Sequence, residues 1–301
     1  MKSTLAGDHP HPSLSRRERE GAAKPRKGEG DTIRHAVTAA AARFGFSHTP
    51  RLDAELLMAH ALGTTREAVL LSRLDDPAPS GFAALADRRA ACEPVAYITG
   101  TRAFWTIDLA VGPGVLIPRA DTETLIEAAV AHFAGTPGPR TVLDLGTGSG
   151  ALLLAALAEW PETRGVGIDA SDAALAIAGD NARRLGVADR VAIRHGDWAG
   201  TGQAFDLILC NPPYVVDSAT LPDEVVRFEP ASALFAGPDG LDDYRLIAPA
   251  LRPQIAPGGV ACIEIGAGQG ETAAALFRAQ GLSVAVRRDL AGRDRCLVVT
   301  P

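Results

Sequence analysis

A short apolar run that ends in a glycine-rich turn constrains the fold of this chain more than any other feature of its sequence. Residues 141–145 form a β-prone run, and the stretch 144–150, Asp-Leu-Gly-Thr-Gly-Ser-Gly, leads from it into a helical pattern that extends to Trp160. Glycines at a strand-to-helix turn let the backbone come close to a ligand. The spacing differs from the G-x-G-x-x-G of dinucleotide-binding turns. The stretch therefore predicts a cofactor site, with a generic Rossmann turn as the alternative.

Strand-like and helical patterns alternate through the rest of this region. Helical patterns cover residues 171–185, 242–255 and 269–280, and β-prone runs cover residues 165–168, 191–194, 205–210, 259–265, 282–287 and 296–300. Such alternation is typical of a parallel sheet with helices on both faces. We therefore predict an α/β fold for residues 119–301, with a doubly wound, Rossmann-like sheet.

Three further segments precede this domain. Residues 1–30 are rich in Pro, Gly, Arg and Glu and poor in large apolar side chains, which predicts a disordered tail. Residues 31–92 show four amphipathic helical patterns, at 32–44, 52–62, 65–72 and 80–92, and form a small all-helical domain that recognises a partner or covers the active site. Residues 93–118 contain β-prone runs at 95–98 and 104–111, which predict a linking β-hairpin.

Charge and cysteine usage exclude several classes of protein. The chain of 301 residues has a net charge of −6, and because the tail carries seven basic and four acidic side chains (+3), the body carries −9. An acidic body does not suit direct binding to nucleic acid. The four cysteines are widely spaced in apolar runs, so we expect reduced core residues. No apolar run approaches the ~18 residues of a membrane span, and no secretory signal is visible, so we expect a cytoplasmic protein without membrane contact.

Acidic side chains follow the next two strands of the predicted sheet. Asp169 ends the second β-prone run, about twenty residues after the glycines, where a carboxylate can accept hydrogen bonds from both hydroxyls of a ribose. Asp197 and Trp198 follow the third run and offer an acceptor for an adenine amino group beside an aromatic surface. Each could also be a turn or core residue. Together with the glycine turn they resemble the class I methyltransferases, which bind S-adenosylmethionine. The predicted cofactor-binding residues are Gly146, Thr147, Gly148, Ser149, Gly150, Asp169, Asp197, Trp198 and Asn211.

The fourth strand ends in Asn211-Pro212-Pro213-Tyr214. Prolines cannot donate to a sheet ladder, so they force the chain out of the sheet at its carboxyl edge, where open α/β sheets bind their ligands. The asparagine side-chain oxygen and the nearby carbonyls form a cluster of acceptors with few donors. Such a corner suits an incoming NH2 group, although a Pro-rich exit loop is the simpler alternative.

The chain resembles the peptide chain release factor glutamine methyltransferases over nearly all of its length after the tail. The matching stretches are residues 53–57, 93–98, 114–119, 144–150, 211–214, 240–242 with 244–245, 264–266 and 289–295. Asn-Pro-Pro-Tyr is shared with amino methyltransferases that act on DNA adenine, so the helical domain and the hairpin are what distinguish the two. Residues 119–123 depart from the family pattern, with Ala-Asp in place of Pro-Glu.

The resemblance implies transfer of a methyl group from S-adenosylmethionine to the glutamine side chain in the Gly-Gly-Gln motif of release factors. No metal is needed for this reaction. We expect the side-chain oxygen of Asn211 and the carbonyl of Pro212 to accept the two amide N–H groups, with Pro213 and Tyr214 against the substrate. Phe104 is expected to wall the glutamine pocket, with packing in the core as the alternative.

Three rival functions remain at this stage. A ribosomal-protein glutamine methyltransferase shares the same spacing. A DNA adenine methyltransferase would need a basic groove, which the −9 body does not offer. A non-catalytic or redox Rossmann protein would bind a nicotinamide cofactor and would tolerate the loss of Asn-Pro-Pro-Tyr.

Overall fold

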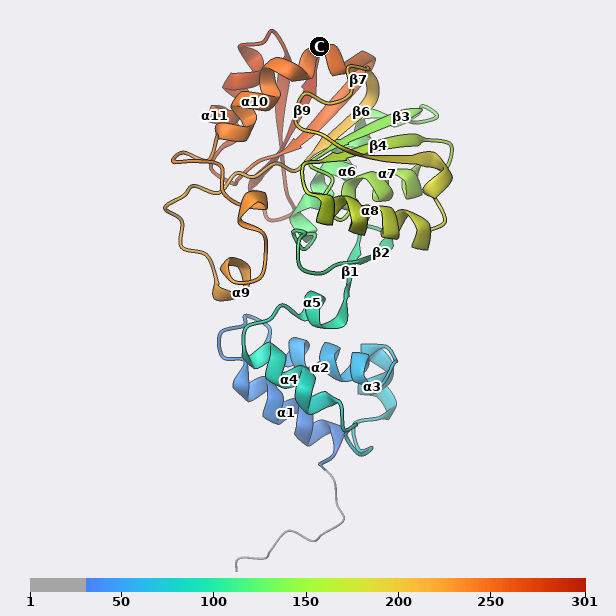
Figure 1. Cartoon of the computed structure of the whole chain (residues 1–301), viewed down its shortest axis with the longest axis vertical. Coiled ribbons are helices and arrows are strands. Elements are labelled where there is room, and N and C mark those ends of the chain that lie inside the picture. The colour runs from blue at the N-terminus through green and yellow to red at the C-terminus, as the bar shows by residue number, and fades with distance from the viewer. Residues whose placement is uncertain (1–30) are drawn as a thin grey trace, which may run out of the picture.

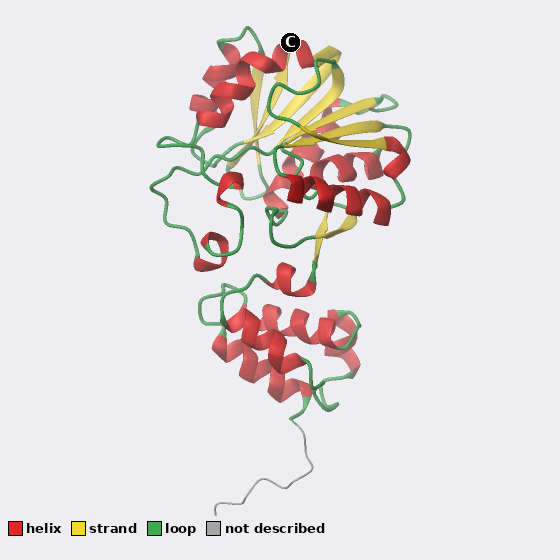
Figure 2. Cartoon of the chain, in the orientation of Figure 1, coloured by secondary structure: helices red, strands yellow, loops and turns green. Residues whose placement is uncertain are grey.

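The computed structural model of the protein describes residues 31–301, and the predicted tail at residues 1–30 lies outside them. An N-terminal helical group is followed by a short two-stranded sheet and then by a large α/β group, as Figures 1 and 2 show. The helical group contains α1 (Ile33–Arg43), α2 (Pro50–Ala61), α3 (Arg66–Ser72) and α4 (Phe82–Ala90).

The helical group packs around its own apolar core. Helices α1 and α3 begin at threonine caps, where Thr32 accepts a hydrogen bond from the N–H of His35 and Thr65 accepts one from the N–H of Ala68. Apolar residues at helical spacing meet inside this group, among them Ile33, Val37, Phe44, Leu57, Met58, Val69 and Phe82. The four predicted amphipathic patterns thus coincide with four helices.

The segment between the two groups differs from its prediction. Residues 95–98 were expected to be extended, but α5 (Val95–Thr99) is one turn of helix that ends at Gly100, and the two strands of the hairpin are β1 (Thr101–Phe104) and β2 (Ile107–Ala110). In the helical turn, the side chains of two neighbouring residues contact different parts of the protein. Ile98 enters the helical core, and the hydroxyl of Tyr97 donates to the carbonyl of Val115 at 2.5 Å. These tertiary contacts override the β propensity of the run.

The large group is built on a seven-stranded sheet with the order β5-β4-β3-β6-β7-β9-β8. The strands are β3 (Thr141–Leu145), β4 (Arg164–Asp169), β5 (Val191–His195), β6 (Phe205–Cys210), β7 (Ile255–Glu264), β8 (Ser283–Arg288) and β9 (Asp294–Thr300). The expectation of an all-parallel sheet is wrong at β9, which runs antiparallel to β7 and β8. Only residues 289–293 join β8 to β9. A connection this short can join two paired strands only when they are antiparallel.

Helices cover both faces of this sheet, as predicted for a doubly wound fold. The elements are α6 (Glu123–His132), α7 (Ala151–Glu159), α8 (Asp172–Arg184), α10 (Asp242–Leu251) and α11 (Gly270–Arg278). Side chains of β6 alternate between the two faces. Ile208 and Cys210 pack in the core that includes α10 and α11, whereas Leu207 and Leu209 pack in the core that includes α6 and α7.

All four cysteines are free. Cys210, Cys262 and Cys296 are buried, in agreement with the expected core role, whereas Cys92 is only partly buried. Within residues 31–301, no helix combines the length and the apolar character that a membrane crossing requires.

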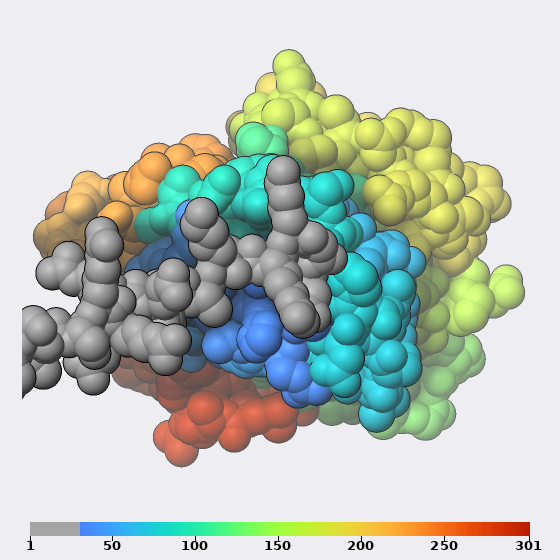
Figure 3. Space-filling view, turned by 90° about the horizontal axis from the view of Figure 1, so that it is seen from below, coloured from blue at the N-terminus to red at the C-terminus, as the bar shows by residue number. Residues whose placement is uncertain are grey.

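The connection from β6 to α10 leaves the sheet and reaches toward the helical group. It carries α9 (Asp223–Val226) and returns to the sheet edge, where Tyr214 and Val215 donate through their N–H groups to the carbonyl of Leu234. Figure 1 shows α9 close to the helical group, and in Figure 3 the orange surface of this connection lies beside the blue and cyan helical residues. The connection therefore links the end of β6 to both parts of the molecule.

Candidate active site

The glycine turn after β3 folds against the next strand. The N–H groups of Gly146 and Thr147 both donate to the carbonyl of Ile168 on β4, each at 2.9 Å. Gly146 has a φ of 71°, a left-handed conformation that costs a residue with a Cβ about 1–2 kcal/mol. A Cβ on Gly146 would also lie 3.0 Å from the ring of Trp198. The turn therefore requires glycine at this position for both conformation and space.

Asp144 lies behind the turn with an unsatisfied carboxylate oxygen. Its Oδ2 accepts hydrogen bonds from the hydroxyl of Thr147 at 2.6 Å and from the N–H of Leu153 at 3.3 Å, whereas its buried Oδ1 has no partner. Burial raises the pKa of Asp144 to about 7, and repulsion from Asp169 adds to the rise. A cationic ligand group beside Oδ1 would compensate this buried acceptor.

The backbone fixes the carboxylate of Asp169 at the end of β4. Its Oδ2 accepts a hydrogen bond from the N–H of Gly148 at 2.8 Å, and its Oδ1 accepts one from the N–H of Ser171 at 2.9 Å. Each oxygen has a second lone pair. The side chain can therefore accept two further hydrogen bonds from a ligand in a fixed orientation.

Asp197 and Trp198 lie in the connection that follows β5. Oδ1 of Asp197 accepts a hydrogen bond from the N–H of Ala199 at 2.9 Å, and Nε1 of Trp198 donates to Oδ1 of Asp243 at 2.9 Å. Burial raises the pKa of Asp243. The hydrogen bond to Asp243 fixes the indole plane, which leaves an aromatic surface next to the glycine turn.

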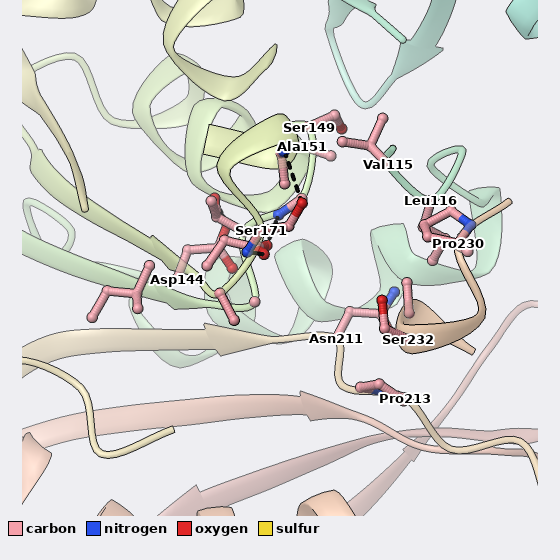
Figure 4. A pocket seen from close by; sticks show the side chains of 18 of the residues that line it. Val115, Leu116, Asp144, Ser149, Ala151, Ser171, Asn211, Pro213, Pro230 and Ser232 are labelled. Carbon is pink, nitrogen blue, oxygen red and sulfur yellow. Dashed lines mark hydrogen bonds between the residues drawn. The ribbon is translucent and has the colours of Figure 1, made fainter. Parts of the chain in front are cut away.

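These groups surround one cavity of about 600 Å³ at the carboxyl edge of the sheet. The predicted residues that line it are Gly146, Thr147, Gly148, Ser149, Asp169, Asp197, Trp198, Asn211 and Pro213. Gly150 and Pro212 belong to the same two turns but do not line the cavity. Figure 4 shows Asn211 and Pro213 at the end of β6 beside Pro230 and Ser232 of the following connection. The structure thus brings together most of the predicted cofactor site.

Asn211 stands between this cavity and a second, smaller one. Its Nδ2 donates to the hydroxyl oxygen of Thr122 at 3.4 Å, which leaves the acceptor Oδ1 as the free end of the amide. The smaller cavity, of about 60 Å³, shares Leu116, Asn211 and Ala233 with the larger one. Since one water needs about 10–15 Å³ of such volume, the smaller cavity has room for a primary amide group.

Sequence reasoning missed the carboxylate of the smaller cavity. Glu264 at the end of β7 is 1% exposed, and its Oε1 accepts a hydrogen bond from the hydroxyl of Tyr214 at 3.1 Å. Burial raises the pKa of Glu264 to about 7 and also raises that of Tyr214. The strand that carries Glu264 was predicted, and the available signal was a carboxylate near the end of that strand, in the matching stretch 264–266.

Phe104 does not reach either cavity. Its ring is 1% exposed and packs in the core between the sheet and α6 and α7. The next residue, Trp105, has a φ of 54° in the hairpin turn, where its N–H donates to Oε1 of Glu123 at 2.9 Å. Strand β1 ends at Phe104, and the packing alternative describes this residue.

Within residues 31–301, no cluster of three or more His, Cys, Asp or Glu side chains is arranged to hold a metal ion. The polar groups of the site are carboxylates, amides and hydroxyls that face two adjoining cavities.

Comparison with known proteins agrees with this geometry. Residues 121–237 match the family described as "Methyltransferase small domain", and residues 35–100 match "PrmC N-terminal domain". With the seven-stranded sheet and its glycine turn, these matches define an S-adenosylmethionine-dependent methyltransferase with an additional helical domain.

Relatives of this chain from several bacteria carry the name release factor glutamine methyltransferase, and two of them show the extent of the similarity. The one from Rhodospirillum rubrum is 46% identical over 83% of this chain and 78% of its own length. The one from Cereibacter sphaeroides is 46% identical over 88% of this chain and 95% of its own length. The chain belongs to the release factor glutamine methyltransferase family.

Among solved structures, a methyltransferase from Pyrococcus furiosus is similar with a TM-score of 0.48 and 16% identity, over 65% of this chain and 89% of that chain.

Proposed function

We propose that the protein methylates the side-chain amide nitrogen of the glutamine in the Gly-Gly-Gln motif of peptide chain release factors. The methyl donor is S-adenosylmethionine. The observation that carries this proposal is the position of Asn211, which lines both cavities and donates through Nδ2 to Thr122, so that its amide oxygen is the free end of the side chain. One cavity has the size and polar groups of a nucleoside site, and the other has the size of an amide.

The larger cavity fits S-adenosylmethionine by the chemistry of its donors and acceptors. The unpartnered Oδ1 of Asp144 suits the ammonium of the amino-acid portion, and the fixed carboxylate of Asp169 suits a ribose diol. Asp197 and Trp198 would then hold the adenine. When bound there, S-adenosylmethionine supplies an electrophilic methyl group.

The acceptors around Asn211 address the main difficulty of the reaction. An amide nitrogen is a weak nucleophile because its lone pair is delocalised into the carbonyl. Oδ1 of Asn211 and the carbonyl of Pro212 would accept the two N–H groups of the glutamine, which orients the nitrogen toward the methyl group. Pro213 lines the larger cavity and Tyr214 the smaller one, so both would flank the substrate side chain.

The helical domain gives this site its protein specificity. Its match to the family's N-terminal domain is what separates this chain from methyltransferases that share only Asn-Pro-Pro-Tyr. We assign residues 31–92 to recognition of the release factor, with residues 93–118 as the linker and residues 119–301 as the methyltransferase domain.

Incubation with methyl-labelled S-adenosylmethionine tests the substrate directly. Purified release factor, ribosomal protein and duplex DNA are offered in parallel, and the modified residue is mapped by mass spectrometry. The proposal expects label on the glutamine of Gly-Gly-Gln in the release factor only. Label on a ribosomal-protein glutamine or on DNA adenine would replace it with the corresponding alternative.

The substitution Asn211→Ala tests the role of the amide oxygen. We expect kcat to fall by at least about 100-fold, because the substrate nitrogen loses an acceptor that orients it. Binding of the cofactor product S-adenosylhomocysteine, measured by calorimetric titration, is expected to persist. Near-normal turnover of the variant would exclude this mechanism.

A further inference from the structure

Glu264 is the last residue of β7 and lies beside Asn211, which follows the end of β6. Strands β6 and β7 are parallel and pair Cys210 with Ile263, so the residues that follow, Asn211 and Glu264, leave the sheet at the same level. Both line the smaller cavity. A group whose amide is oriented by Asn211 would therefore have the methyl donor on one side and Glu264 on the other.

One oxygen of Glu264 is left without a partner. Oε1 accepts the hydrogen bond from Tyr214, whereas Oε2 is buried and unpaired. Buried polar atoms in folded proteins are nearly always hydrogen-bonded, because an unpaired one costs about 1–3 kcal/mol. Because Glu264 lines a cavity of amide size, its unpaired oxygen points to a donor that arrives with the ligand.

The groups around Glu264 leave it able to change its protonation state. Arg295 and the hydroxyls of Thr122 and Tyr214 favour the charged form, whereas burial and repulsion from Asp121 oppose it. Burial is the largest of these effects, and the pKa of Glu264 is about 7.

Two further neighbours complete the surroundings of Glu264. Arg119 lines the same cavity, and the hydroxyl of Tyr244 donates to the backbone carbonyl of Glu264 at 2.9 Å. The pKa of Tyr244 lies well above its usual value because of burial and Glu264, so this hydroxyl stays protonated. Among these neighbours, Glu264 is the group that titrates near neutral pH.

We infer that Glu264 is the base that removes a proton from the substrate amide during methyl transfer. This inference rests on the proposed function. The nitrogen lone pair forms the N–C bond as the S–C bond breaks and its electron pair stays on sulfur. As the nitrogen takes up the methyl group, one of its two hydrogens leaves its acceptor at Asn211 or Pro212. That N–H bond breaks and the proton passes to Oε2 of Glu264. The positive charge on sulfur and the negative charge on Glu264 disappear together, so no charge is left unpaired in a buried site.

This assignment predicts a specific pH dependence. A general base must be ionised, so kcat rises with pH through the pKa of Glu264 and levels off above it. Tyr214→Phe removes a hydrogen bond to the ionised form and is expected to move this rise to higher pH. In Glu264→Gln, which keeps the shape of the side chain, the rise is expected to vanish and kcat at pH 8 to fall by about 100-fold or more.

The kinetic test compares wild type, Glu264→Gln and Glu264→Asp on purified release factor from pH 5.5 to 9. These pH limits are chosen to lie about 1.5–2 units on either side of the relevant pKa. We expect the KM for release factor to be unchanged in Glu264→Gln. In Glu264→Asp, part of the activity should return, and kcat should again rise with pH. Wild-type turnover in Glu264→Gln would overturn it. A uniform loss that keeps the wild-type pH profile would instead show a structural role for Glu264.

A second measurement does not depend on the identity of the substrate. The infrared spectrum of wild type minus that of Glu264→Gln isolates the carboxylic-acid band of Glu264. The band is expected at pH 5 and should be lost by pH 9, with a midpoint near the pKa of about 7. A Glu264 that is ionised throughout this range overturns the inference even if release factor is methylated. If Glu264 titrates in this range but release factor is not labelled, only the proposed function is contradicted.

Discussion

At the scale of single residues, two buried carboxyls with a pKa of about 7 stand at the same sheet edge. Asp144 is in β3 and Glu264 ends β7. In both cases burial raises the folded-state pKa above its unfolded value, so the folded state binds more protons than the unfolded state between about pH 4 and pH 7. The free energy of unfolding therefore falls as pH rises through this window.

The ligand-free protein is accordingly expected to be less stable at pH 8 than at pH 5. Each carboxyl lowers the free energy of unfolding by up to about 1.4 kcal/mol for each pH unit in the window. Urea unfolding at the two pH values measures the difference. Asp144→Asn is expected to remove roughly half of it, because two comparable groups contribute. Identical pH dependence in wild type and variant would show that Asp144 is ionised at pH 5.

At the scale of elements, the strand–turn–helix at residues 141–159 determines how closely the backbone approaches the cofactor cavity. Two glycines of the turn, Gly146 and Gly148, both have positive φ values, of 71° and 55°. Their surroundings differ. A Cβ on Gly146 would press on the ring of Trp198, whereas a Cβ on Gly148 would meet no atom within 4 Å.

Gly146→Ala and Gly148→Ala therefore form a matched pair. Both are expected to pay about 1–2 kcal/mol for the left-handed conformation. Both glycines line the cofactor cavity, so either methyl group is expected to weaken binding of S-adenosylhomocysteine, by about tenfold for each 1.4 kcal/mol lost, and calorimetric titration measures this loss. Only Gly146→Ala should also displace Trp198, which changes the near-ultraviolet circular dichroism of the ligand-free protein. An unchanged spectrum in Gly146→Ala would mean that the added methyl group does not press on the ring of Trp198.

Sequence periodicity predicted the elements of the large domain because apolar spacing and turn glycines are local signals. The same reasoning predicted a strand at residues 95–98, where contacts of Tyr97 and Ile98 with distant partners produce a helix instead. It found Asn211 through its prolines. It could not find the link from Tyr214 to Glu264, which lie 50 residues apart in the sequence and meet only through the strand order.

At the scale of the whole molecule, a buried arginine joins the helical domain to the methyltransferase domain. Arg89 of α4 has a side chain that is 4% exposed, and it forms ion pairs with Asp53 of α2 at 2.8 Å and with Glu224 of α9 at 2.6 Å. The connection that carries α9 also supplies Pro230 and Ser232 to the wall of the cofactor cavity. Contacts on the helical domain can therefore influence the wall of the active site.

Arg89→Ala and Glu224→Gln separate the two functions of this arginine. Arg89→Ala leaves Asp53 buried without its partner, so we expect the free energy of unfolding to fall by about 3–5 kcal/mol. Glu224→Gln keeps the pair with Asp53, and because the side chain of Glu224 is 33% exposed, its loss should cost about 1 kcal/mol or less. Urea unfolding measures both changes in the free energy of unfolding.

Hydrogen exchange at residues 223–232 should nevertheless rise in both variants, because each removes the contact that ties α9 to the helical domain. Unchanged exchange in Glu224→Gln would show that the hydrogen bonds of the connection itself, rather than Arg89, fix its position over the cavity.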